Sequence, residues 1–177
     1  IAFVNGGGIR KQIEAGDITL DDIYSVHPFG NTMCVIRVTG QQVLDALEWG
    51  ARAVPSENGG FLQVSGLTYE IHTGIASSAE KDENGMFTRV SGEYRVKNVM
   101  VGGQPLELDK TYTLASHNYM LLGHGDGYTM FDGCEVLGED MMVDNQVLIT
   151  YITTTLGGVV GEQYANPYGD GRIVAVE

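Results

Sequence analysis

Three glycine-rich loops constrain this chain more than any other feature of its sequence. They are residues 5–10 (NGGGIR), 28–31 (PFGN) and 118–128 (NYMLLGHGDGY), and each adjoins an apolar run of strand character. Glycines let backbone N–H groups approach a ligand closely, and each loop also carries polar or aromatic side chains. The three loops are therefore the candidate binding elements of the chain.

Strand-like runs occupy much of the remaining sequence. Apolar or alternating patterns predict strands in residues 1–5, 33–38, 61–72 and 171–177. Residues 94–117 predict two or three strands with a hairpin turn at GGQP. The small, polar and charged residues between 73 and 88 predict an exposed hairpin or excursion.

Helices are predicted by capping patterns followed by apolar faces. Thr19 with Asp22 opens a short helix, and Thr39 with Gln42 opens a longer one that runs to about residue 53. Asp144 begins another long helix, whose apolar side is Val147, Leu148, Tyr151 and Ile152. Mixed strands, helices and hairpins without a linker or repeat predict the α+β class, as one domain with a mixed β-sheet and packed helices.

Size and charge exclude several classes of function. The 177 residues, 43% of them hydrophobic, suit a single globular domain. The net charge of −13 repels phosphate backbones, so a nucleic-acid partner is not expected. No apolar run is long enough for a membrane-spanning segment. Cys34 and Cys134 show no zinc spacing and are expected to be separate buried thiols.

The first loop combines glycines with a permanently charged side chain. Arg10 offers a planar fork that suits an anion, whereas an ordinary turn with a surface arginine is the alternative. The loop lacks the spacing of either glycine-rich nucleotide motif. In the second loop, Phe29 is either a ring folded back on the core or a platform that stacks on a flat ligand.

The third loop places Asp126 between two glycines. Such an aspartate is first a turn former, but its carboxylate also suits two hydrogen bonds from vicinal sugar hydroxyls. His117 and His124 have no third ligand at a useful spacing, so a metal site is not expected here.

Five segments of the sequence, taken together and in order, resemble the C-terminal domain of the 5′-nucleotidases. They are NGGGIR, PFGNT, VTGQQVLDALE, GGFLQVSGL and TYTLASHNYMLLGHGDGY. That family includes UDP-sugar hydrolases and 2′,3′-cyclic-nucleotide phosphodiesterases, and the resemblance covers nearly the whole chain. It implies that residues 1–177 form a nucleoside-recognition domain. The family's N-terminal catalytic domain is then absent from this chain, whose first residue is not Met and whose opening run reads as the middle of a buried strand.

The resemblance also implies a role for individual residues. Two aromatic rings hold the base in this family, and Phe29 matches the first ring while Asn31 matches a contact to the base. Asp126 matches the carboxylate that holds the ribose hydroxyls. The resemblance implies three further substrate contacts, at Asn5, Arg10 and Gly60. Arg10 would reach the ribose and phosphate side, and Gly60 would make its contact through the backbone of the Gly59–Gly60 turn.

Two departures from the family pattern concern the third loop. An aromatic residue often lies six positions before the aspartate, where this chain has Met120, with Tyr119 one place earlier. Either Tyr119 stacks on the base or Met120 packs its thioether there. His124 replaces a glycine, which predicts that the backbone at this position avoids a conformation open only to glycine.

The family's chemistry is hydrolysis assisted by two divalent metals, of the zinc or manganese type, in the N-terminal metallophosphoesterase domain. This chain shows none of the metal-binding patterns of that domain, so no catalytic or metal-binding residue and no cofactor is assigned to it. The expected partners are a nucleoside or nucleotide and the catalytic domain of the same polypeptide. The parent is expected to be extracytoplasmic: secreted, periplasmic or attached to the cell wall.

Three alternatives to a 5′-nucleotidase parent stay open at this point. The parent could hydrolyse 2′,3′-cyclic nucleotides or nucleotide sugars, since the bond is broken in the other domain. A non-catalytic nucleotide-binding surface module is the third, and Met120 and His124 favour it.

Overall fold

A five-stranded mixed sheet forms the centre of the molecule. The computed structural model describes residues 1–166 and 169–177. The strand order is β10 (Glu135–Gly138), β2 (Met33–Thr39), β9 (Thr111–His117), β1 (Ala2–Asn5) and β3 (Leu62–Ser65). β1 runs parallel to β9 and antiparallel to β3, and the long β2–β9 ladder is antiparallel. The carboxyl ends of β1 and β9 therefore leave the sheet at the same edge.

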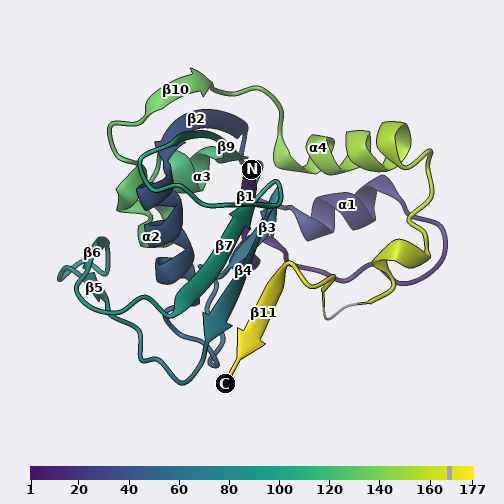
Figure 1. The fold of residues 1–177 in the computed structure, drawn as a ribbon. Helices are drawn as coiled ribbons and strands as arrows, with labels where there is room; N and C mark the ends of the chain where they lie inside the picture. The colour runs from purple at the N-terminus through teal and green to yellow at the C-terminus, as the bar shows by residue number, and fades with distance from the viewer. Residues whose placement is uncertain (167–168) are drawn as a thin grey trace.

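A second sheet of four strands packs beside the first (Figure 1). Its order is β11 (Ile173–Val176), β4 (Leu67–His72), β7 (Val96–Val101) and β8 (Gln104–Pro105). The segment expected to be an excursion is a separate hairpin of β5 (Ala79–Lys81) and β6 (Phe87–Val90). The expected α+β class and mixed sheet are confirmed.

The single strand predicted for residues 61–72 is wrong. β3 and β4 are two strands that belong to different sheets. Buried and exposed residues alternate within each strand, but the alternation shifts by one residue at Gly66, since Ser65 and Gly66 are both exposed. Gly66 has φ +79°, a left-handed conformation that redirects the chain.

Four α-helices complete the fold of the described residues: α1 (Leu20–Val26), α2 (Gly40–Ala51), α3 (Asn118–Leu121) and α4 (Asp144–Thr150). α4 continues as a π-helical turn over Tyr151–Thr155. Figure 1 shows α1 and α4 side by side on one side of the sheets, with α2 on the other. Short 3-10 turns occupy Gly6–Gly8, Gly125–Gly127, Thr129–Phe131 and Glu162–Tyr164.

Both predicted capping boxes are present. The Thr19 hydroxyl accepts from the Asp22 amide while the Asp22 carboxylate accepts from the Thr19 amide, and Thr39 and Gln42 do the same for α2. Such reciprocal caps satisfy two helix-terminal donors at once. α2 then buries its whole second half, including Trp49, against both sheets.

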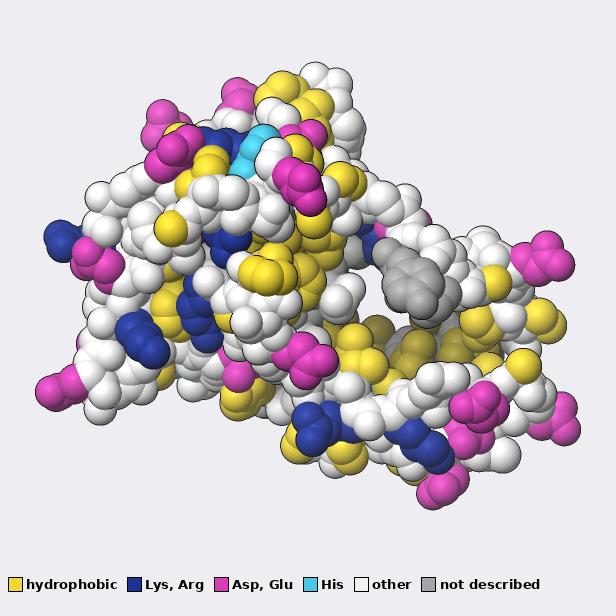
Figure 2. Space-filling view, turned by 90° about the horizontal axis from the view of Figure 1, so that it is seen from below, with side chains coloured by type: hydrophobic (Ala, Val, Ile, Leu, Met, Phe, Trp, Pro, Cys, Tyr) yellow, Lys and Arg dark blue, Asp and Glu magenta, His cyan; other side chains and the backbone are white. Residues whose placement is uncertain are grey.

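Acidic and basic side chains are interspersed over the face of the molecule shown in Figure 2. Within the described residues, no helix is both long enough and apolar enough to cross a membrane.

Candidate functional site

A pocket of about 540 Å³ opens where the three glycine-rich loops meet. Its lining comes from separate parts of the chain, which the sheet and helices bring to one place. The lining residues are Asn5, Gly7, Gly8, Arg10, Phe29, Asn31, Gly59, Tyr119 and Asp126. Six of the eight residues singled out from the sequence thus line one cavity.

The first loop is fixed to the turn that precedes β3. The Gly6 amide donates to the Phe61 carbonyl and the Gly7 amide donates to the Gly59 carbonyl, both at 2.7 Å. Asn5 ends β1, is only 5% exposed and lines the pocket. Arg10 is exposed at the rim, where its Nη1 donates to the Gly7 carbonyl at 3.1 Å.

Asp126 receives hydrogen bonds on both carboxylate oxygens. Asn5 Nδ2 donates to its Oδ2 at 2.6 Å, and the Tyr119 hydroxyl donates to its Oδ1 at 3.2 Å. The backbone is held as well, because the indole Nε1 of Trp49 donates to the Asp126 carbonyl at 2.9 Å. Asp126 has φ +55°, and left-handed backbone at a non-glycine residue is a feature that concentrates at functional sites.

Phe29 is 59% exposed, so the interpretation of its ring as part of the core is wrong. The ring lines the pocket, and the guanidinium carbon of Arg10 lies 5.8 Å from its centroid, within the range of a cation–π contact. Asn31 holds the same loop in place through its backbone, since its carbonyl accepts from the Asp144 amide at the start of α4.

The structure distinguishes Tyr119 from Met120. Tyr119 is 43% exposed and lines the pocket, whereas Met120 is fully buried in the core, where the Ser116 hydroxyl donates to its sulfur at 3.8 Å. Met120 therefore does not reach the pocket. The Tyr119 ring lies against Gly125, where a Cβ atom would come within 2.3 Å of it, so this position has no room for a side chain.

His124 does not occupy a conformation open only to glycine. Its φ is +55° and its ψ is +24°, which lie in the left-handed helical region. Histidine enters this region more readily than most residues. The turn supports it, because the His124 carbonyl accepts from the Gly127 amide at 2.9 Å and its Nε2 lies 3.2 Å from Asp132 Oδ1.

Gly60 is not among the residues that line the pocket, whereas its neighbour Gly59 is. A Cβ atom on Gly60 would come within 3.1 Å of the Asp126 Cβ, so the turn packs closely against that side chain. The hydroxyl of the buried Tyr128 donates to the Gly60 carbonyl. Burial raises the pKa of Tyr128 well above its ordinary value, which keeps this donor protonated.

Several supporting residues were not found from the sequence. Trp49 lies on a well-predicted amphipathic helix, but no local pattern shows that its indole reaches residue 126. Arg52 stacks on Trp49 at 3.6 Å and donates to its carbonyl. His117 Nε2 lies 3.1 Å from Asn5 Oδ1 and is only 6% exposed. Apart from the local Arg52–Trp49 pair, these contacts join residues distant in sequence, so local periodicity carries no signal for them.

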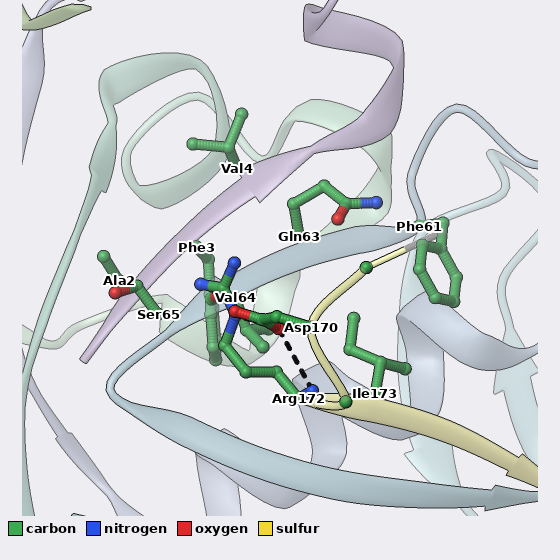
Figure 3. Close-up of a pocket in the computed structure, with 12 residues that line it drawn as sticks. Ala2, Phe3, Val4, Phe61, Gln63, Val64, Ser65, Asp170, Arg172 and Ile173 are labelled. Carbon is green, nitrogen blue, oxygen red and sulfur yellow. Dashed lines mark hydrogen bonds and ion pairs between the residues drawn. The ribbon is translucent and has the colours of Figure 1, made fainter. Parts of the chain in front are cut away.

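A second cavity, of about 480 Å³, lies between β1, β3 and the start of β11 (Figure 3). Arg172 fills part of it, donating to the Val64 carbonyl at 2.6 Å and to Asp170 at 2.8 Å. The contact with Val64 joins β3 to the residue that precedes β11, so this arginine links the two sheets, while Asp170 pairs with it from the same segment. None of the residues expected to bind a ligand lines this cavity.

The described residues contain no group of three or more His, Cys, Asp and Glu side chains that could hold a metal ion. The fold and the pocket define a class: an α+β domain with a loop-built cavity at one edge of a mixed sheet. Residues 1–133 match the model of the 5′-nucleotidase C-terminal domain, and the chain belongs to that family.

Relatives agree over most of the chain. The trifunctional nucleotide phosphoesterase protein YfkN of Bacillus subtilis is 35% identical over 176 residues, which are 99% of this chain and 11% of that protein. Protein UshA of Escherichia coli is 30% identical over 85% of this chain and 24% of its own length. The 5′-nucleotidase precursor from Thermus thermophilus superposes with a TM-score of 0.79 at 32% identity, over 99% of this chain and 31% of that structure. The chain thus spans a tenth to a third of these relatives.

Proposed function

We propose that this domain recognises the nucleoside part of a nucleotide for a metal-dependent phosphohydrolase of the 5′-nucleotidase type. The observation that carries the proposal is that three side chains line one 540 Å³ cavity. They are the exposed Phe29, Tyr119, and Asp126, which accepts a hydrogen bond on each carboxylate oxygen. Such a cavity has room for a base and a sugar.

The base is held between Phe29 and Tyr119. Both rings line the pocket, and stacking on an aromatic side chain contributes on the order of 1–3 kcal/mol per base. Asn31 contacts the edge of the base, and the backbone of the 59–60 turn passes close to it. Asp126 accepts from the ribose hydroxyls, since each carboxylate oxygen has a second lone pair beyond the one that Asn5 or Tyr119 uses.

Arg10 faces the phosphate side of the ligand. The chain has ten Lys and Arg against 23 Asp and Glu, so a nucleotide meets few cations on this surface. Arg10 lines the pocket beside Phe29, which places a permanent positive charge next to the stacked base. AMP should therefore bind more tightly than adenosine, and the difference should shrink as salt is added.

Hydrolysis belongs to a metallophosphoesterase domain of the same polypeptide, which carries the two divalent metals. The relatives are named 5′-nucleotidase, UshA and nucleotide phosphoesterase, and each is several times longer than this chain. The described residues do not fit a metal pair, so no step of the reaction is assigned to them. The 177-residue chain alone is expected to leave AMP intact, and metal-dependent release of phosphate by a clean preparation would overturn this.

The direct test is a titration of the 177-residue chain with adenosine and AMP, followed by NMR. Two stacking contacts predict a Kd of about a millimolar. Phe29→Ala should weaken binding at least about fivefold, while Tyr24→Ala should not change it, because Tyr24 is 47% exposed but does not line the pocket. Equal Kd values for Phe29→Ala and the unaltered chain would contradict the base clamp.

Matched ligands test the sugar contact and the alternatives. If Asp126 holds the ribose, 2′-deoxyadenosine and 3′-deoxyadenosine should each bind more weakly than adenosine. A full-length enzyme that acts on cyclic nucleotides or nucleotide sugars would recognise the nucleoside in the same way. Activity assays of the full-length protein must therefore separate these alternatives. The location outside the cytoplasm is part of the same proposal, and the name precursor given to the Thermus thermophilus relative agrees with it.

A further inference from the structure

His117 meets the binding site at two residues: it is hydrogen-bonded to Asn5, and its ring centroid lies 5.9 Å from that of Tyr119. His117 ends β9, beside β1, and its Nε2 lies 3.1 Å from Oδ1 of Asn5. Asn5 in turn donates from Nδ2 to Asp126 at 2.6 Å. His117 does not line the 540 Å³ pocket, and both His117 and Asn5 are more than nine-tenths buried.

The chemistry of these groups fixes the direction of both hydrogen bonds. A carboxylate only accepts, so the Asn5 atom that faces Asp126 is the NH₂ group. The Asn5 carbonyl oxygen then faces His117, and an oxygen only accepts, so the proton of the imidazole lies on Nε2. Burial lowers the pKa of His117, which agrees with a neutral ring in this tautomer.

We propose that His117 is a positioning residue: it orients the Asn5 amide, which in turn aims the Asp126 carboxylate at the sugar of the ligand. The inference rests on the proposed function for what Asp126 binds. Without the donor on His117, the Asn5 amide could turn over and present its oxygen to the carboxylate, which would repel it. The pocket would then lose the orientation of its sugar contact, although its shape would stay.

The packing around Asn5 leaves its side chain little freedom. A Cβ atom on Gly8 would come within 2.7 Å of Asn5 Oδ1 and 3.8 Å of His117 Nε2, so the glycine-rich loop closes directly over the Asn5–His117 contact. The orientation of the amide is therefore set by its two hydrogen-bond partners.

Two replacements of His117 separate positioning from packing. Gln reaches about as far as Nε2 and carries a donor there, whereas Asn ends near the position of Nδ1. His117→Gln should keep the Kd for adenosine, and His117→Asn should weaken it roughly three- to tenfold. In the Asn5→Ala background, His117→Asn should cause no further loss, because its effect passes through Asn5.

The Asn5 side-chain NH₂ signals in ¹H–¹⁵N spectra supply a readout that needs no ligand. They should keep their shifts in His117→Gln and move in His117→Asn, with thermal unfolding showing that both variants are folded. Additive losses of affinity in the Asn5→Ala background, or unchanged NH₂ signals in His117→Asn, would overturn the proposal. If the unaltered chain bound no nucleoside but the NH₂ signals moved as described, the proposed function would fail while the orientation of Asn5 by His117 stood.

Discussion

The hydroxyl of Tyr119 donates to Oδ1 of Asp126 across 3.2 Å. The residue whose ring is proposed to stack on the base is therefore hydrogen-bonded to the carboxylate that is proposed to hold the ribose. Burial and the nearby Asp126 charge raise the pKa of Tyr119, which keeps this hydroxyl protonated at neutral pH. The two proposed contacts to a nucleoside are therefore linked before any ligand arrives.

Replacing Tyr119 separates these two contributions. Tyr119→Phe keeps the ring and frees Oδ1, so the affinity for adenosine should hold or rise by up to about threefold. Tyr119→Ala removes the ring and should cost on the order of 1–3 kcal/mol of binding free energy. Calorimetry on both variants makes the comparison, and a loss of equal size in both would show that the hydroxyl carries the contact.

Met120 should matter for stability and leave binding unchanged. It is fully buried, so Met120→Ala should lower the free energy of unfolding by about 2–5 kcal/mol through the cavity it leaves. Met120→Leu nearly conserves volume and should cost less than about 1.5 kcal/mol. Urea denaturation gives both values. A weaker Kd for adenosine in folded Met120→Leu would contradict the assignment of Met120 to the core.

Trp49→Phe should loosen the third loop from a distance. The substitution removes the indole donor to the Asp126 carbonyl while keeping an aromatic ring in the core. It also reduces the aromatic surface on which Arg52 stacks. We expect a loss of stability of about 1–3 kcal/mol. Amide hydrogen exchange of residues 124–128 should accelerate more than that of β2. Equal acceleration in both segments would indicate general destabilisation only.

Glu48 should make stability depend on pH. The side chain is fully buried on α2, and burial raises its pKa above the ordinary 4.5, against the opposing effect of the Val96 amide that donates to Oε2. A raised pKa in the folded state means that stability is fully present below about pH 4.5 and declines as pH rises through the folded value.

The control for this effect is Glu48→Gln, which cannot ionise. The free energy of unfolding of the unaltered chain, minus that of Glu48→Gln, should fall as pH rises from 4 toward 7. Thermal or urea unfolding across that range measures it. A difference that is constant with pH would mean that Glu48 ionises in the folded protein as readily as in the unfolded chain.

Local sequence signals predicted much of the secondary structure, because capping and alternation act over a few residues. Thr39 with Gln42 gave the correct start of α2, and the apolar runs gave β1, β2 and β9. The break at Gly66 was missed because the two alternating runs adjoin, although the alternation shifts by one residue there. The left-handed backbone at His124 was missed because a side chain replaces the expected glycine there.

The candidate site was predicted as a set of residues through the family resemblance, and the structure places most of that set around one cavity. Its supports were not predicted. The contacts of Asp126 with Asn5 and Trp49 join residues far apart in the chain, and no local pattern encodes such contacts. The choice between Tyr119 and Met120 likewise needed the fold, because one turn of α3 decides which side chain faces the core.

The span of the pocket along the chain bears on how the domain is made. Its lining begins at Asn5 and is complete only at Asp126, and the loop of Phe29 is held by the start of α4 at Asp144. During synthesis, the glycine-rich loop after β1 thus emerges long before the partners that orient it. Nucleoside affinity would then appear only once most of the domain has folded, so a nucleoside would serve as a reporter of completed folding and as a ligand that favours the finished domain over its intermediates.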